Sequence, residues 1–164
     1  MQQNSRNIVI LPSQTISANG NSGMIGIPEG YNAVTLYLNV GTATGTLPTL
    51  DIYIQQGFKA LASTDLTAGL DAQASSFTIW DDYIHFTQVT AGPGTQVCRV
   101  FDGCGTSAAN APTASITAGS DAALAAATVR AGDIGTAWRV KWVVGGTTPS
   151  YPTVWILGQF VPTS

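Results

Sequence analysis

Two stretches combine an alternating strand pattern with the same turn signature, and this combination constrains the fold more than any other feature. In AVTLYLNV (33–40) and AWRVKWVV (137–144), residues alternate in character with a period of two. Each is followed by Gly-Thr-x-Pro, at 45–48 and 146–149, and then by an apolar run. Glycine supplies a turn, and proline fixes φ where a strand begins and a missing N–H costs least. We therefore expect the unit strand, Gly-Thr-x-Pro turn and strand twice, as two hairpins in similar positions of a β-sandwich.

Further strand signals run along the chain. Short apolar runs lie at 7–12, 22–28, 83–90 and 95–101, and AGPG (91–94) predicts a hairpin between the last two. The closing run, TVWILGQF (153–160), is apolar on both faces, so it is either central in its sheet or covered by a partner. Many short strands with Gly and Pro turns predict an all-β fold, a β-sandwich of the jelly-roll type.

The remaining segments suggest the domain organisation. SDAALAAATVRAG (120–132) is the one helix candidate, but its Thr128 and Val129 dilute the pattern, so we expect at most one short helix. The surrounding residues are small and polar, and we predict a long loop or insertion at 103–133. The 164 residues fit one domain. We expect an extended N-terminal arm at 1–12 and a single β-sandwich domain at 13–164.

The composition excludes several function classes. Charged residues make up only 9% of the chain against 45% hydrophobic residues, so we expect partners to cover much of the surface. The six basic residues are scattered and the net charge is −3, which argues against nucleic-acid binding. No apolar run approaches the roughly 18 to 20 residues of a membrane helix. The first residues lack a secretory pattern, so we expect synthesis in a cytoplasm.

The two cysteines leave two alternatives open. Cys98 and Cys104 lie six positions apart across an expected turn at Asp102–Gly103, and this spacing would allow a disulfide. In a protein made in a cytoplasm, two free thiols are the alternative. A zinc site is improbable because the chain has one histidine. We predict no bound metal and no cofactor.

The segment WDDYIH (80–85) comes nearest to a catalytic constellation. A Ser–His–Asp triad would need Ser22, His85 and Asp82, but no nucleophile-elbow motif surrounds any serine. We therefore predict that the protein is not an enzyme and that His85 faces solvent or an interface. Asp81 and Asp82 do not have the spacing of a calcium loop. They would instead end a strand edge with charge or accept a salt bridge from Lys59 or Arg139.

Aromatic residues offer one further binding signal. A tryptophan and five tyrosines would form a sugar-binding face if they gathered on one side of the sandwich: Trp80, Tyr31, Tyr37, Tyr53, Tyr83 and Tyr151. The alternative is that tyrosines occupy outward strand positions because they suit a pleated, half-buried surface, and we favour it.

Two long segments resemble small β-rich virion proteins of tailed bacteriophages. They are WDDYIHFTQVTAGPGTQVCRVF (80–101) and TAWRVKWVVGGTTPSYPTVWILGQF (136–160), together with Asn-Val followed by Gly-Thr-Leu-Pro-Thr-Leu-Asp at 39–51. The resemblance covers 31–58 and 80–160, whereas the alanine-rich 110–132 does not match and is expected to be an insertion. Within this group the chain is most similar to a capsid decoration, or cement, protein.

The resemblance implies a non-enzymatic protein on the capsid surface of the virion. Such proteins bind the major capsid protein at capsomer junctions and often form homotrimers. A tail, baseplate or head–tail connector subunit is the second interpretation, and a carbohydrate-binding module for host adsorption is the third. Few charges and an apolar last strand are compatible with cement binding. We expect the partner-binding residues to lie in the arm and the last strand: Ile8, Val9, Ile10, Leu11, Trp155 and Leu157.

Overall fold

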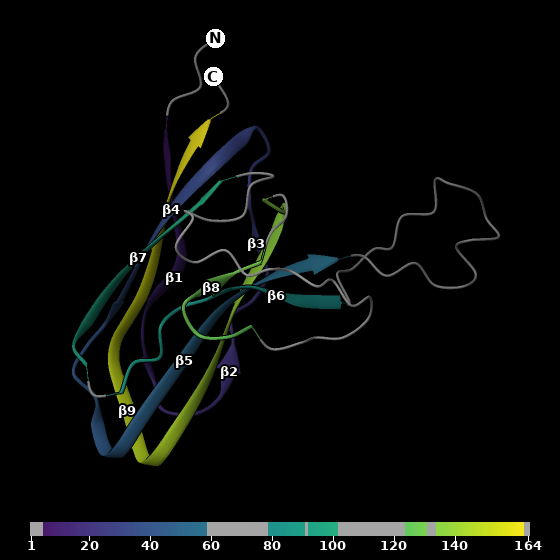
Figure 1. Ribbon diagram of the computed structural model, residues 1–164. Helices are drawn as coiled ribbons and strands as arrows, with labels where there is room; N and C mark the ends of the chain where they lie inside the picture. The colour runs from purple at the N-terminus through teal and green to yellow at the C-terminus, as the bar shows by residue number, and fades with distance from the viewer. Residues whose placement is uncertain (1–4, 59–78, 91, 102–123, 131–133, 163–164) are drawn as a thin grey trace, which may run out of the picture.

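The computed structural model describes residues 5–58, 79–90, 92–101, 124–130 and 134–162. This part of the chain forms nine strands (Figure 1). They are β1 (Arg6–Ile16), β2 (Gly20–Asn21), β3 (Ile25–Gly26), β4 (Tyr31–Val40), β5 (Thr44–Phe58), β6 (Ile79–His85), β7 (Gly94–Phe101), β8 (Thr128–Val129) and β9 (Ala137–Pro162). The described residues contain no helix. None of them therefore belongs to a helix that could span a membrane.

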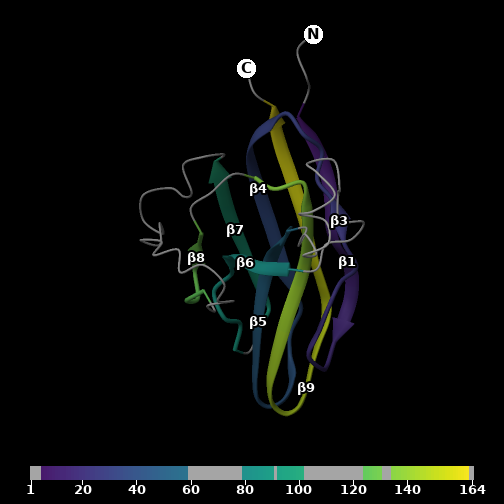
Figure 2. The ribbon, with the colours of Figure 1, turned by 90° about the vertical axis from the view of Figure 1, so that its right-hand side faces the viewer.

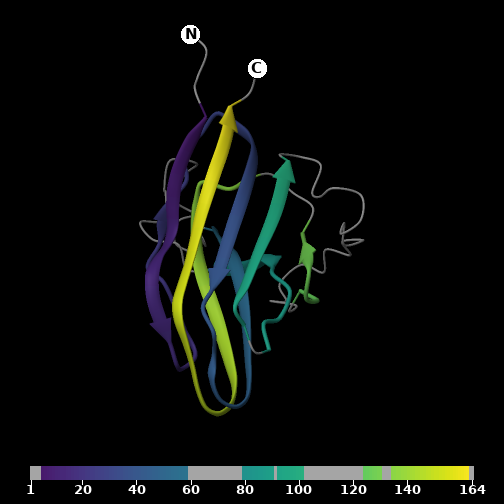
Figure 3. The same cartoon turned by 90° about the vertical axis from the view of Figure 1, so that its left-hand side faces the viewer.

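The strands form two layers that share β9. Sheet A has the order β7-β4-β9-β1, and Figure 3 shows these strands side by side. Sheet B has the order β8-β6-β5-β9, and β2 and β3 pair with the far side of β9. The first half of β9 lies in sheet B and the second half in sheet A (Figure 2). The chain therefore has the all-β, sandwich-like fold that the sequence predicts, and its layers join into a nearly closed, barrel-like sheet.

The alternating patterns decide which side chains enter the core. Val34, Leu36, Leu38 and Val40 of β4 are fully buried, as the period-two pattern predicts. On β5 and β9 the same rule buries two further sets: Leu50, Ile52 and Ile54, and Trp138 and Val140. Trp138 packs between the layers, with ring centroids 5.9 Å from those of both Tyr83 and Phe160. The closing strand is central in sheet A, between β1 and β4, and its Val154 and Ile156 enter the core.

The two Gly-Thr-x-Pro motifs pair with each other and do not form two separate hairpins. β5 and β9 both bend between the layers at the same end of the molecule (Figure 1), where Thr46 lies opposite Thr147. Gly45 and Gly146 have φ of 106° and 102°. A Cβ on either glycine would lie 2.5–2.6 Å from a carbonyl oxygen of the other motif. The repeat is therefore needed because two neighbouring strands turn the same corner.

The N-terminal segment is a strand of sheet A from Arg6 onward, which corrects the expectation of an extended arm over residues 1–12. β1 pairs antiparallel with β9 along its length. Ile10 and Leu11 are each only 1% exposed, so this strand contributes to the core. The physical reason is that the apolar residues 8–11 fill the edge of the sandwich beside the last strand.

Two connections also differ from expectation. β6 pairs with β5 and β8, whereas β7 pairs with β4, so AGPG connects strands of different sheets and is not a hairpin turn. β6 already has a neighbour on each side, so β7 does not pair with it. Of the predicted helix at 120–132, residues 124–130 form a turn and β8, and the rest lies outside the described residues. Most of the predicted insertion at 103–133 also lies outside the described residues.

Candidate partner-binding surface

The predicted binding residues of the first and last strands lie side by side. Val9 of β1 is the register partner of Leu157 of β9, and Trp155 lies two positions before Leu157 on the same face. This is the outer face of sheet A, the side away from sheet B. Val9 is 58% exposed, and Trp155 and Leu157 are half-buried. Together with Leu11, Ser13 and Ile156 they line a shallow hollow of about 240 Å³.

The other predicted residues face the core. Ile10 and Leu11 are buried, and Ile8 packs against the core from the edge. A register shift between Val9 and Leu11 turns both Ile10 and Leu11 inward, where strict alternation would have placed one of them outside. Of the six predicted residues, Val9, Trp155 and Leu157 are thus the ones that a partner can reach most directly.

The apolar surface continues across the whole sheet. Leu157 is opposite Tyr37 of β4, and Tyr37 is opposite Val97 of β7, which is 58% exposed. We call Val9, Leu157, Tyr37 and Val97 the outer apolar row. The pattern of β4 predicted that Tyr37 points away from the core. Strand order alone brings it beside Leu157, and alternation within one strand carries no information on strand order.

The neighbours of the outer apolar row are polar but mostly uncharged. On the next positions of the sheet, Asn39 lies opposite Trp155 and Thr95, and Thr35 lies opposite Gln159 and Arg99. The Asn39 side-chain amide donates to the Thr153 carbonyl oxygen at 3.1 Å. Arg99 is the one charged residue at these positions. A face of this kind loses little hydration free energy of charged groups when a partner covers it.

A polar network occupies the outer face of sheet B instead. His85 Nε2 lies 3.1 Å from Asp51 Oδ1, and His85 Nδ1 lies 2.7 Å from the Leu124 carbonyl oxygen. A carbonyl oxygen only accepts, so Nδ1 is the donor there. The His85 ring also stacks on Tyr53, with centroids 3.9 Å apart. Burial, helped by the negative charges of Asp51 and Asp82, raises the pKa of Tyr53. The histidine is thus held from three sides and is buried, contrary to a solvent-facing position.

A second group of polar residues in this network surrounds Asp82. Its carboxylate is fully buried, accepts a 2.6 Å hydrogen bond from the Gln55 amide, and lies 3.6 Å from Lys141 Nζ. Arg139 Nε in turn donates to Gln55 Oε1 at 2.7 Å. Asp81 forms an ion pair with Arg130 at 3.2 Å. The expected salt-bridge partner Lys59 lies outside the described residues.

The geometry does not assemble a catalytic triad. Ser22 lies beyond β9, where its hydroxyl donates to the Gly23 carbonyl and accepts from the Val140 N–H. His85 is on β6, and β5 and β9 lie between the two residues. The acid nearest to His85 is Asp51, which the sequence did not single out. Neither Ser22 nor Asp82 is therefore a partner of the histidine in proton transfer.

The aromatic residues do not gather on one face. Tyr83 and Tyr151 are core residues, and Tyr31 packs against Phe160 with ring centroids 5.7 Å apart. Lys141 Nζ lies 5.1 Å from the Tyr53 ring, and the Arg139 guanidinium lies 4.5 Å from the Trp80 ring. Side chains of the protein itself thus lie against the Tyr53 and Trp80 rings, and Tyr37 lies apart from them on the outer face of sheet A.

The described residues also include no group of three or more His, Cys, Asp or Glu side chains arranged to hold a metal ion. Cys98 has a free thiol, and its potential partner Cys104 lies outside the described residues. Burial raises the pKa of Cys98 to about 11. A thiol of this kind is a poor nucleophile at neutral pH.

Comparison with known proteins adds no relative: no protein-family model matches the chain, and no curated protein matches it.

Proposed function

We propose that the protein is a non-enzymatic structural component of a tailed-phage virion, and that it binds the assembled capsid as a decoration protein. The observation that carries this proposal is the outer face of sheet A. The outer apolar row crosses four strands and includes two valines that are each 58% exposed. Exposed apolar residues that form a continuous row are typical of a surface that binds another protein.

The chemistry of this surface fits a capsid seam. Apolar and uncharged polar side chains bind with little dependence on salt, because few charges need counterions. A protein that binds the assembled lattice, and not free capsid subunits, stabilises the particle by mass action. The sequence resemblance favours tailed phages, and from it we further propose homotrimers at capsomer junctions on the virion surface. The buried polar network of sheet B supports the fold.

The copy number of the protein in purified virions tests this proposal. Quantitative mass spectrometry would compare its abundance with that of the major capsid protein. We expect a number that matches the capsid subunits or the threefold sites of the particle. A handful of copies per virion would instead indicate a tail, baseplate or connector subunit, and would overturn the decoration role.

A further inference from the structure

We infer that β7 captures an extended segment of the capsid protein as an additional strand of sheet A; this inference rests on the proposed function. β7 and β8 are the two ends of the strand order, so each has one neighbour among the described strands. A strand at a sheet edge presents backbone N–H and C=O groups that a further strand can pair with. The question is whether this edge is protected against such pairing.

The other described edge strands carry the protections that proteins commonly use. β2, β3 and β8 are two residues long. β1 has three register shifts along its pairing with β9, and it contains Pro12. Short length, irregular register and proline all prevent the addition of another strand.

β7 has none of these protections. It pairs with β4 over eight consecutive positions without a register shift, and it contains no proline. Arg99 is its one charged residue. Val97, Val100 and Cys98 suit an extended backbone. A long, regular edge strand with a single charge is a template for strand addition.

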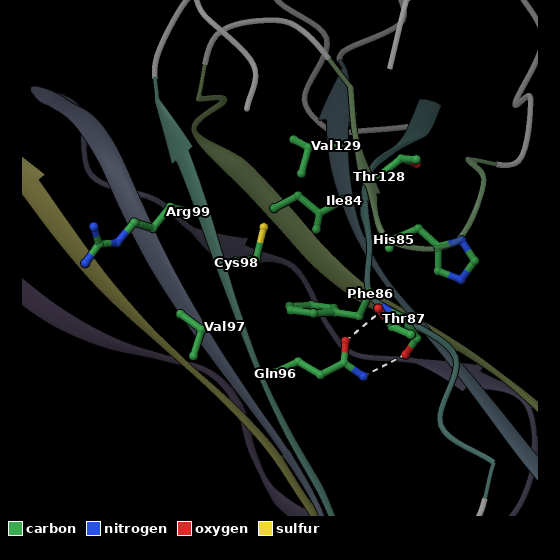
Figure 4. A pocket seen from close by; sticks show the side chains of 11 residues that line it. Ile84, His85, Phe86, Thr87, Gln96, Val97, Cys98, Arg99, Thr128 and Val129 are labelled. Carbon is green, nitrogen blue, oxygen red and sulfur yellow. Dashed lines mark hydrogen bonds between the residues drawn. The ribbon is translucent and has the colours of Figure 1, made fainter. Parts of the chain in front are cut away.

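The space beside β7 favours a single strand over a second folded domain. A hollow of about 120 Å³ lies between β7 and the edge of sheet B, and Ile84, Phe86, Cys98 and Val129 form part of its lining (Figure 4). In Figure 4 the Cys98 side chain points toward Ile84 and Val129, whereas Arg99 points away. At one end, the Gln96 amide bonds to both backbone groups of Thr87, at 2.8 and 2.7 Å, and ties β7 to sheet B. A strand added to β7 would place alternate small apolar side chains in this hollow.

Proline substitutions at two neighbouring positions test the inference. Backbone N–H groups alternate sides along an antiparallel strand, so one of Cys98 and Arg99 donates toward β4 and the other toward the open edge. We therefore compare Cys98→Pro with Arg99→Pro. The variant that loses a hydrogen bond to β4 should unfold at a lower temperature. The variant that loses the N–H on the open edge should keep the wild-type melting temperature. We expect the stable variant to lose binding to heads assembled without the protein, by at least about tenfold in Kd. The controls Cys98→Val and Arg99→Thr retain the N–H and should bind normally.

Hydrogen exchange gives an independent result on the unmodified protein. On the particle, amides of β7 should exchange at least about tenfold more slowly than in free protein, while those of β5 in sheet B should not change. Normal binding by the stable proline variant, or unchanged exchange in β7, would overturn strand capture and leave the proposed function intact. A dimer of free protein that the stable proline variant abolishes would assign the edge to a second copy and also overturn it. Failure of the wild-type protein to bind heads would contradict the proposed function itself.

Discussion

The thiol of Cys98 is a titratable group that lies in apolar surroundings. Cys98 lies on the inner side of β7, and its thiol lines the hollow beside Ile84 and Val129. Burial raises its pKa to about 11 from 9.0, so the protonated form is favoured in the folded protein. The residue therefore behaves as a small hydrophobic side chain.

We predict slow reaction of Cys98 with a thiol reagent. In a Cys104→Ser protein at pH 8, Ellman's reagent should modify Cys98 roughly a hundredfold more slowly than an unfolded control, because the thiolate fraction is that much lower. Modification at the rate of the unfolded control would contradict the burial of this thiol.

The same shift makes stability depend on pH. The folded pKa of Cys98 lies above the unfolded value, so the contribution of this thiol to the free energy of unfolding is complete below pH 9. It is lost as the pH rises through about 11. Two pKa units correspond to a loss of roughly 2 to 3 kcal/mol at most. Urea unfolding of the wild type and Cys98→Val at pH 8 and pH 11 measures this difference.

β1 is the element whose role the structure changes most. Removing Met1–Pro12 would delete Ile10 and Leu11, which are both fully buried, together with most of the pairing with β9. Loss of each such side chain costs about 2 to 5 kcal/mol, and the total is comparable with the whole stability of a domain. We predict that the truncated protein does not fold, as measured by circular dichroism. Val9→Thr, which keeps the strand, should fold normally. A folded truncated protein would show that β1 is dispensable.

The faces of single strands could be predicted from the sequence because they depend on local alternation. In AWRVKWVV, Trp138 and Val140 are buried, and Arg139 and Lys141 lie on the other face. In TVWILGQF, apolar residues on both faces predicted a strand that is either central in its sheet or covered by a partner, and β9 lies between β1 and β4. These patterns depend only on whether each side chain faces the core or the outside of its own strand.

Properties that depend on distant pairing were not predictable in this way. Asp51 and His85 lie 34 positions apart and meet because β5 and β6 are neighbours. The two Gly-Thr-x-Pro motifs were expected in separate hairpins, because neither motif contains information on which distant segment it pairs with. The outer apolar row draws one residue from each of four strands, so it exists only once their order and register are known.

The molecule as a whole has two outer faces of different chemistry. The outer face of sheet A carries the outer apolar row and uncharged polar neighbours. The outer face of sheet B carries Asp51, Tyr53, Gln55, Arg139 and Lys141, which bond or stack among themselves and with β6. Binding of a large apolar partner is therefore expected on sheet A and not on the polar face of sheet B.

β9 passes through both sheets and so provides a matched pair of positions for a direct test. Leu157 lies on the outer face of sheet A, and Val143, which is 37% exposed, lies on the outer face of sheet B. Both side chains are apolar and both substitutions to lysine should leave the fold intact, because neither residue is in the core. The pair thus compares the two faces with the same chemical change.

The binding of Leu157→Lys and Val143→Lys to heads assembled without the protein is the most direct measurement of the central claim. We predict that Leu157→Lys weakens binding by at least about thirtyfold, because a charge would be buried against the capsid. Val143→Lys should bind within about twofold of the wild type. Equal binding by the two variants, or a greater loss for Val143→Lys, would contradict the assignment of sheet A as the capsid-binding face.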